Sequence, residues 1–252
     1  MSDDHLMSIH RRLKEHALVG TFSKTSDPNM VEAIGMAGMD FIILDLEHGP
    51  NDIANLGSLI RACERSEMAP VVRVLRNDQI GRALDIGARA VQIPHIGTAA
   101  AAEAAVKAAR FAPEGNRGVC RYVRAADHSS ADKADYFRRA NDITVIAQVE
   151  GKEGLENLDS ILEVPGVDVI FLGVYDLSQS LGFTGQVERP EVVDALKEVI
   201  RKCEAKGIPV GTFVESVETA NRYKEMGVHY LCYAVDVGIL YEASRSIRQS
   251  IR

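Results

Sequence analysis

The chain has 252 residues, of which 46% are hydrophobic and 26% charged, the composition of a globular protein with material for a large core. Its 29 Lys and Arg against 36 Asp and Glu give a net charge of −7, which disfavours a general nucleic-acid-binding protein. Because no stretch approaches ~18 consecutive apolar residues, we expect no membrane-spanning helix and interpret the chain as an enzyme acting on small molecules.

Eight short apolar segments of strand length follow one another along the chain, separated by stretches of helical character. They cover residues 17–22, 41–47, 70–74, 90–96, 144–150, 167–173, 208–214 and 229–235. Most of them are nearly continuously apolar, as buried parallel strands are, whereas half-exposed antiparallel strands alternate. The pattern therefore predicts a parallel sheet covered on its outer face.

The helical patterns between these strands have recognisable ends. Asp27 is placed to cap a helix that begins at Pro28 and runs to Met36. Further helices are predicted over residues 51–66, 98–111, 191–206 and 216–226, the last two ending before a glycine.

Eight strand–helix pairs at roughly 31 residues each predict a single (β/α)8 barrel domain over residues 1–252. A doubly wound open sheet also alternates, but GTFSKTSDPN after the first strand lacks its GxGxxG phosphate loop. Residues 112–141 form a longer excursion, basic over residues 115–130, that we interpret as a functional loop or lid. The four cysteines form no CxxC pair and no secretion signal begins the chain, so we expect reduced thiols and a cytoplasmic protein.

Polar residues interrupt or follow the apolar strands at the end where such barrels hold their active sites. They are Asp45, Glu47 and His48 at the second strand, Arg73 at the third, Gln148 and Glu150 at the fifth, and Asp176 after the sixth. Carboxylates from neighbouring strand ends, here Glu150 and Asp176, can hold Mg²⁺, Mn²⁺ or Co²⁺. Each could instead cap the helix that follows it.

His48 lies in a turn bounded by Gly and Pro, where an imidazole can move protons near neutral pH. Asp45 or Asp85 could orient it and raise its basicity, although a lone histidine is more often a surface residue. Arg73 interrupts PVVRV and needs an anionic partner, either a substrate or Glu47.

The order and spacing of LDLEHGP, QVE and GVYDLSQSLG resemble those of the HpcH/HpaI aldolase/citrate lyase family. The likeness extends over GTFSKTSDPNMVEAIGMAGMDFIILDLEHGPND, PVVRV, ALDIGARAVQIPHI, ARFAPEGNRGV and IAQVEGKEGLENLDSIL. It implies a class II pyruvate aldolase that depends on a divalent metal cation. Such an enzyme reversibly cleaves a 4-hydroxy-2-keto acid to pyruvate and an aldehyde through a metal-stabilised enolate, without a lysine Schiff base.

The resemblance also implies a role for each polar residue. Glu150 and Asp176 would bind the metal, and Gln148 would contact the substrate. His48 would be the acid/base with Asp85 (or Asp45) raising its basicity, Arg73 would stabilise the enolate, and the backbone around Val174, Tyr175 and Asp176 would receive the keto-acid carboxylate. The family commonly has Pro and a small residue where this chain has Val174 and Tyr175, which predicts a narrower or reshaped pocket. The stretch between Arg73 and Asp85 is also about two residues short of the family pattern.

Family members commonly form hexamers, trimers of dimers, that exchange a C-terminal helix, for which the segment after Asp236 is the candidate. One alternative is a lyase or synthase acting on oxaloacetate, for example forming citrate for siderophore assembly. Arg117, Arg121 and Arg124 would then bring extra cations to the mouth, unless they are solvated lid residues. A non-catalytic keto-acid-binding barrel is disfavoured by the joint presence of the polar residues above. A phosphate-binding barrel isomerase is disfavoured because VESVE and AVDVG offer no glycine-rich cradle.

Overall fold

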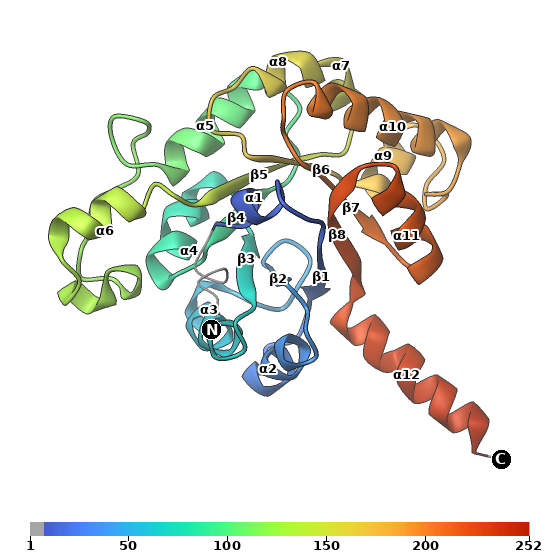
Figure 1. Cartoon of the computed structure of the whole chain (residues 1–252), viewed down its shortest axis with the longest axis horizontal. Helices are drawn as coiled ribbons and strands as arrows, with labels where there is room; N and C mark the ends of the chain where they lie inside the picture. Colours follow the sequence, from blue (N-terminus) through green and yellow to red (C-terminus); the bar gives the residue numbers. More distant parts are fainter. Residues whose placement is uncertain (1–7, 252) are drawn as a thin grey trace.

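The computed structural model describes residues 8–251, and in it eight parallel strands close into a barrel in the order β1 to β8 (Figure 1). The strands are β1 (Leu18–Ser23), β2 (Phe41–Asp45), β3 (Ala69–Arg73), β4 (Ala90–Ile93), β5 (Thr144–Val149), β6 (Val169–Leu172), β7 (Val210–Val214) and β8 (Val228–Val235). This confirms the predicted (β/α)8 barrel, and every predicted strand overlaps an observed one.

Helices surround the barrel, and each helix predicted from the sequence is present within a few residues. They are α1 (Ile9–Arg12), α2 (Pro28–Met36), α3 (Ile53–Arg65), α4 (Ile80–Ile86), α5 (Ala99–Ala109), α6 (Lys133–Arg139), α7 (Lys152–Glu156), α8 (Leu158–Leu162), α9 (Val174–Ser180), α10 (Pro190–Glu204), α11 (Val217–Glu225) and α12 (Asp236–Ser250), with short 3-10 turns η2 (Asn77–Gln79) and η3 (Arg124–Ser129). The Asp27 carboxylate accepts the N–H of Asn29 at 2.9 Å, so the predicted cap of α2 is confirmed.

Two apolar cores follow from the alternation of side chains along the strands. In β2, Ile42 and Leu44 pack outward against the helices, whereas Phe41 and Ile43 point into the barrel. Helix α1 packs against the inner core, because its Ile9 belongs to the same cluster of buried side chains. Strands buried on both faces explain why the sequence is apolar at nearly every strand position.

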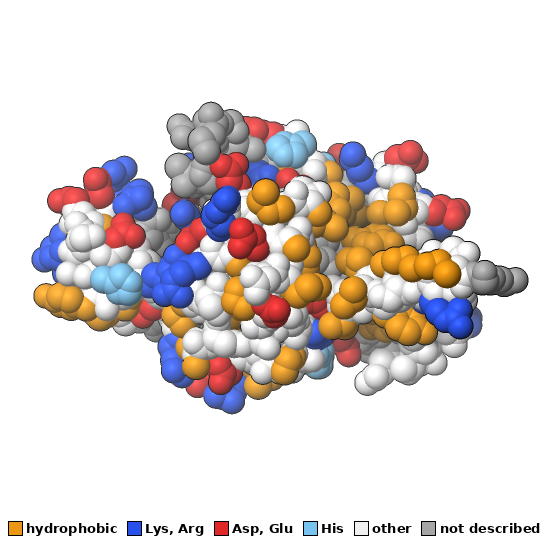
Figure 2. Space-filling view, turned by 90° about the horizontal axis from the view of Figure 1, so that it is seen from below, with side chains coloured by type: hydrophobic (Ala, Val, Ile, Leu, Met, Phe, Trp, Pro, Cys, Tyr) orange, Lys and Arg blue, Asp and Glu red, His pale blue; other side chains and the backbone are white. Residues whose placement is uncertain are grey.

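Helix α12 extends away from the barrel instead of packing along it (Figure 1). Asp236 at its start is buried, but every residue from Tyr241 to Ser250 is exposed. Apolar side chains lie along this arm (Figure 2), among them Leu240, Tyr241 and Ile247. None of the helices within residues 8–251 is long and apolar enough to cross a membrane.

Candidate active site

In β2, β3, β4 and β5 the inward-facing row changes from apolar to polar at the C-terminal end of the barrel. Phe41 and Ile43 are followed by Asp45, and Val71 is followed by Arg73. In β5, Ile146 is followed in the same row by Gln148. The register pairs Asp45 with Arg73 and Arg73 with Gln92 of β4. Since all strands are parallel, these side chains meet at one mouth, as the sequence predicts.

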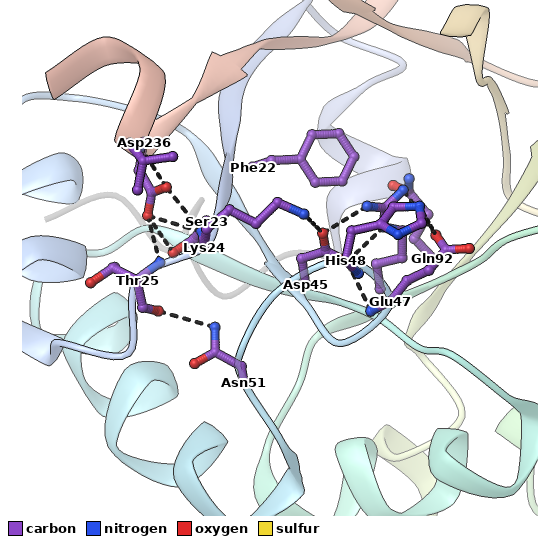
Figure 3. Close-up of polar contacts among 12 residues, drawn as sticks. Phe22, Ser23, Lys24, Thr25, Asp45, Glu47, His48, Asn51, Gln92 and Asp236 are labelled. Atoms are coloured by element: carbon purple, nitrogen blue, oxygen red, sulfur yellow. Dashed lines mark hydrogen bonds and ion pairs between the residues drawn. The ribbon is translucent and has the colours of Figure 1, made fainter. Parts of the chain in front are cut away.

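Asp45 is fully buried and is held by two cations. Arg73 grips it in a bidentate pair, with Nε 2.8 Å from Oδ1 and the terminal nitrogen 2.7 Å from Oδ2, and the Lys24 ammonium also contacts Oδ2 (Figure 3). Burial raises the pKa of Asp45, but hydrogen bonds and charge from Arg73 and Lys24 outweigh it and lower the pKa to about 2. Asp45 is therefore a permanent anion that fixes the Arg73 guanidinium at the mouth.

The Asp45 carboxylate also stabilises the sharp turn that follows β2, because it accepts backbone N–H groups of that turn. Its Oδ1 accepts the N–H of Glu47 at 3.0 Å and the N–H of His48 at 3.3 Å. The His48 ring projects from this turn with 62% of its side chain exposed, and its Nε2 lies 3.7 Å from Oε2 of Glu47. Asp45 thus orients His48 through the backbone, while Glu47 is the carboxylate beside the imidazole.

Glu47 links several of these groups. It forms the ion pair with Arg73 that the sequence offered as an alternative, at 3.0 Å, so that Arg73 contacts two carboxylates. Its other oxygen lies 3.0 Å from Nε2 of His95. On the far side, Nδ1 of His95 lies 2.7 Å from Oε1 of Glu150. His95 therefore bridges the second and fifth strand ends.

Glu150 does not cap the helix that follows it, because Gly151 is the N-cap of α7 and the carboxylate points into the mouth. Oε1 accepts the backbone N–H of His95 at 2.6 Å, and Oε2 accepts from the Gln148 amide. Burial raises the pKa of Glu150, the contacts with Gln148 and His95 oppose that rise, and the charge of Asp176 adds to it.

Two backbone features permit this arrangement. His95 adopts a φ of 57°, a left-handed conformation uncommon outside glycine, and this conformation points its N–H at Glu150. Gly173, the N-cap of α9, lies against the same carboxylate: a Cβ there would be 2.7 Å from Oε2 of Glu150. Only glycine leaves that oxygen in place.

A cavity of about 380 Å³ opens at this mouth, within the size range of small-molecule sites. Its lining includes most of the residues predicted from the sequence, namely His48, Arg73, Gln148, Val174, Tyr175 and Asp176, together with Lys24, Gly173, Glu215 and the apolar Phe22, Phe171, Phe213 and Val235. The predicted site residues therefore converge on one space, with Asp45 buried behind Arg73.

Asp85 is the exception. It lies in α4, where its carboxylate accepts from Arg117 at 2.6 Å, and no contact joins it to His48 in the described part of the chain. The short segment after Arg73 folds into η2 and α4, which directs Asp85 toward the excursion over residues 112–141 and not toward the mouth. Asp85 therefore does not contact His48 within the described chain, and its role toward His48 stays a prediction.

The three arginines expected at the mouth also lie elsewhere. Arg117 pairs with Asp85, and Arg124 pairs with Glu64 and donates to the Ile86 carbonyl at 3.0 Å. Arg121 donates to the carbonyl of Ser129 at 2.5 Å. Within the described residues, Arg117 and Arg124 therefore tie the excursion to α3 and α4, Arg121 bonds within the excursion, and none of the three lines the cavity at the mouth.

Three residues at the mouth, Lys24, His95 and Glu215, were not singled out by the sequence analysis. Lys24 directly follows β1 and reaches Asp45. Its backbone N–H is held at 2.9 Å by Asp236, which also accepts from Ser23 and Thr25 (Figure 3). His95 is hidden in the sequence because IPHI reads as the continuation of a strand, although Pro94 at the end of β4 is a signal that the strand stops.

The donor set suits a divalent cation. No group of three or more His, Cys, Asp or Glu side chains converges as a complete metal site in residues 8–251. Glu150 and Asp176, however, are close enough that the charge of one raises the pKa of the other. Two hard oxygen ligands at neighbouring strand ends, with open cavity beside them, match the way Mg²⁺ or Mn²⁺ is bound when water and substrate complete its shell.

Comparisons with known proteins show which sequences and structures the chain resembles. The sequence profile described as HpcH/HpaI aldolase/citrate lyase matches residues 18–243. The chain is 37% identical over 237 residues to 5-keto-4-deoxy-D-glucarate aldolase of Shigella boydii, covering 93% of this chain and 91% of that protein. Among solved structures, an HpcH/HpaI aldolase/citrate lyase family protein of Burkholderia cenocepacia has a TM-score of 0.92 at 35% identity, covering 97% and 98% of the two chains. Citrate synthase SbnG has a TM-score of 0.86 at 31% identity, covering 96% and 97%.

Proposed function

Since this chain belongs to the HpcH/HpaI aldolase/citrate lyase family and is an aldolase, a carbon–carbon lyase, we propose that it reversibly cleaves a 4-hydroxy-2-keto acid to pyruvate and an aldehyde. The observation that carries the proposal is one cavity lined by the Arg73 guanidinium, the exposed His48 imidazole and the Asp176 carboxylate. Asp45 fixes the guanidinium, and Glu150 contacts Gln148, which also lines the cavity. A non-catalytic barrel would have no need for the buried, doubly paired Asp45 behind that guanidinium.

The pyruvate unit binds at the β5–β6 side of the cavity. Glu150 and Asp176 would hold a divalent cation, which supplies Lewis-acid polarisation of the keto oxygen. The Gln148 amide contacts Glu150 and lines the cavity, and the backbone of Val174 and Tyr175, which also line it, would receive the carboxylate. Gly173 keeps the Glu150 carboxylate where this arrangement needs it.

Arg73 stabilises the negative charge that develops on the substrate oxygen when the carbon–carbon bond breaks. Its guanidinium is pre-oriented by Asp45 and packs over the Phe22 ring, 4.5 Å from the centroid, so little reorganisation accompanies the reaction. His48, exposed at the mouth beside Glu47, moves the proton between the substrate hydroxyl and solvent.

Exchange of the pyruvate methyl protons with D₂O, followed by NMR, tests the proposal without knowledge of the aldehyde. Protein stripped with EDTA should be inactive and should regain exchange with Mg²⁺, Mn²⁺ or Co²⁺. Glu150→Gln should abolish exchange, whereas Glu153→Gln, an exposed carboxylate in α7, should not. Absence of exchange with every cation would overturn pyruvate as the donor. Exchange or cleavage seen with oxaloacetate alone would then favour the related synthase reaction.

For assembly, we propose that α12 is exchanged between protomers in a hexamer built from dimers. The support is the arm itself, since its apolar side chains Leu240, Tyr241 and Ile247 are more than half exposed in one chain (Figure 2). Leu240→Asp should reduce the molar mass measured by light scattering, whereas Glu242→Gln on the same helix should not. An unchanged mass in Leu240→Asp would contradict the exchange.

A further inference from the structure

One wall of the cavity is built by Tyr175, in the first turn of α9, and Glu215, which follows β7. The Tyr175 hydroxyl donates to Oε1 of Glu215 at 2.7 Å, and its ring packs edge-on against Phe213 with centroids 5.8 Å apart. Because the Tyr175 hydroxyl donates this hydrogen bond, the phenol is the neutral partner and Glu215 is the carboxylate that accepts it. The wall is therefore a hydrogen-bonded pair that carries one negative charge.

No cation neutralises that charge in the described structure. The two cations that line the cavity, Lys24 and Arg73, are both paired with Asp45. The Tyr175 hydroxyl is the hydrogen-bond partner found for the Glu215 carboxylate within residues 8–251. A divalent cation at Glu150 and Asp176 would offset those carboxylates and leave Glu215 as an uncompensated anion facing the cavity.

The position of the pair assigns it to the aldehyde half of the reaction. The pyruvate half is accounted for by the β5–β6 side, where Gln148 and Glu150 lie. Glu215 comes from the neighbouring β7 end, and it also lines a second cavity of about 190 Å³ together with Thr219 and Tyr223 of α11. A fragment extending from the pyruvate methyl carbon along this wall meets the phenol and the carboxylate.

We infer that Tyr175 and Glu215 set the aldehyde specificity: they favour an uncharged, hydroxylated aldehyde and disfavour one that carries a carboxylate. A hydroxyl can donate to Glu215, and its oxygen can face the phenol. A carboxylate at the same place can accept from neither the Glu215 anion nor a free cation, and like charges at contact distance repel. The inference rests on the proposed function and names the substrate class within it.

It also separates this chain from its named relative. The substrate in the name of the Shigella boydii protein, 5-keto-4-deoxy-D-glucarate, is a sugar acid with a carboxylate at each end. The resemblance predicts a small residue where this chain has Tyr175, so we expect the aldehyde preference of this chain to differ from that of the named relative.

Aldol addition of pyruvate to aldehydes matched in length but not in charge tests the inference. Glycolaldehyde is compared with glyoxylate, and butanal with succinate semialdehyde, and kcat/KM is measured for each with the unaltered protein and two variants. Glu215→Gln removes the charge and keeps the shape. Glu218→Gln removes an equally exposed charge three residues on, which does not line the cavity.

In Glu215→Gln the kcat/KM for the carboxylated aldehyde should rise relative to its uncharged match by about tenfold in at least one pair, because a unit-charge repulsion has been removed. Glu218→Gln should leave both ratios unchanged. For each pair, the ratio of the two kcat/KM values in a variant is divided by the same ratio in the unaltered protein, so differences in the intrinsic reactivity of the two aldehydes cancel. Unchanged ratios in Glu215→Gln, or an equal shift in Glu218→Gln, would overturn the inference. Failure of pyruvate proton exchange in the unaltered protein would instead overturn the proposed function.

Discussion

The Asp45→Asn substitution tests the electrostatic arrangement behind the mouth more sharply than any other. Asp45 has no exposed surface, and it neutralises Arg73 through two hydrogen bonds of 2.8 and 2.7 Å and Lys24 through a third contact. Asparagine keeps the shape and can still accept the N–H groups of the following turn. It leaves the buried guanidinium with Glu47 as its remaining carboxylate partner.

The expected loss at pH 7 is about 3–5 kcal/mol of the free energy of unfolding, as for other buried pairs from which one partner is removed. Part of this loss depends on pH. The pKa of Asp45 is lowered from 3.8 to about 2, so it contributes about 2 kcal/mol that is fully present above pH 4 and is lost as the pH falls through 2. About half of that contribution should be gone at pH 3.

Urea unfolding followed by circular dichroism at pH 7, 5, 4 and 3 measures both quantities. The difference between the unaltered protein and Asp45→Asn should shrink by about 1 kcal/mol from pH 7 to pH 3. Asp78→Asn is the matched control, because Asp78 also binds an arginine through two oxygens, at 3.1 and 3.3 Å, but that pair is fully in solvent. A pH-independent difference for Asp45→Asn, or a loss no larger than that of Asp78→Asn, would refute the reasoning.

Three further outcomes follow from the site. His48→Ala should lower kcat by roughly 10²–10⁴-fold while calorimetry still detects Mn²⁺ binding, and unchanged turnover would remove His48 from the mechanism. Gly173→Ala, whose Cβ would lie 2.7 Å from Oε2 of Glu150, should weaken Mn²⁺ binding in calorimetry, whereas Gly151→Ala, which meets no atom within 4 Å, should not. Lys24→Met should raise the pKa of Asp45 toward its unfolded value, so the Asp45 contribution that is lost between pH 7 and pH 3 in the urea titration should be smaller; an unchanged loss would show that Arg73 alone sets that pKa.

The barrel could be predicted from the sequence because its causes are local. Strands that are buried on both faces must be apolar at nearly every position. Helix starts can be recognised from capping residues, such as Asp27 followed by Pro28. The polar residues that end those apolar runs had to lie at one mouth once the strands were parallel. Arg73, Gln148 and Glu150 were found in this way.

Contacts between segments far apart in the chain could not be predicted in this way, because the local sequence pattern does not show which side chains will meet. Asp85 is the type of residue that an active site uses. The segment before it is about two residues shorter than in the family pattern, and its carboxylate pairs with Arg117, away from the mouth. Lys24 follows a strand like many solvated lysines, and only the closure of β1 beside β2 brings it to Asp45.

The sequence by itself thus determined the fold and the chemical type of the site, since both depend on periodicity and on which side chains end the strands. The tertiary structure decided which charges are free. Asp45 pairs with both Lys24 and Arg73. Glu215, after β7, lines the cavity, and among residues 8–251 its carboxylate has a hydrogen bond from the Tyr175 phenol and no cation beside it. Electrostatic compensation depends on distances of a few ångströms between segments far apart in the chain, and those distances exist only in the folded barrel.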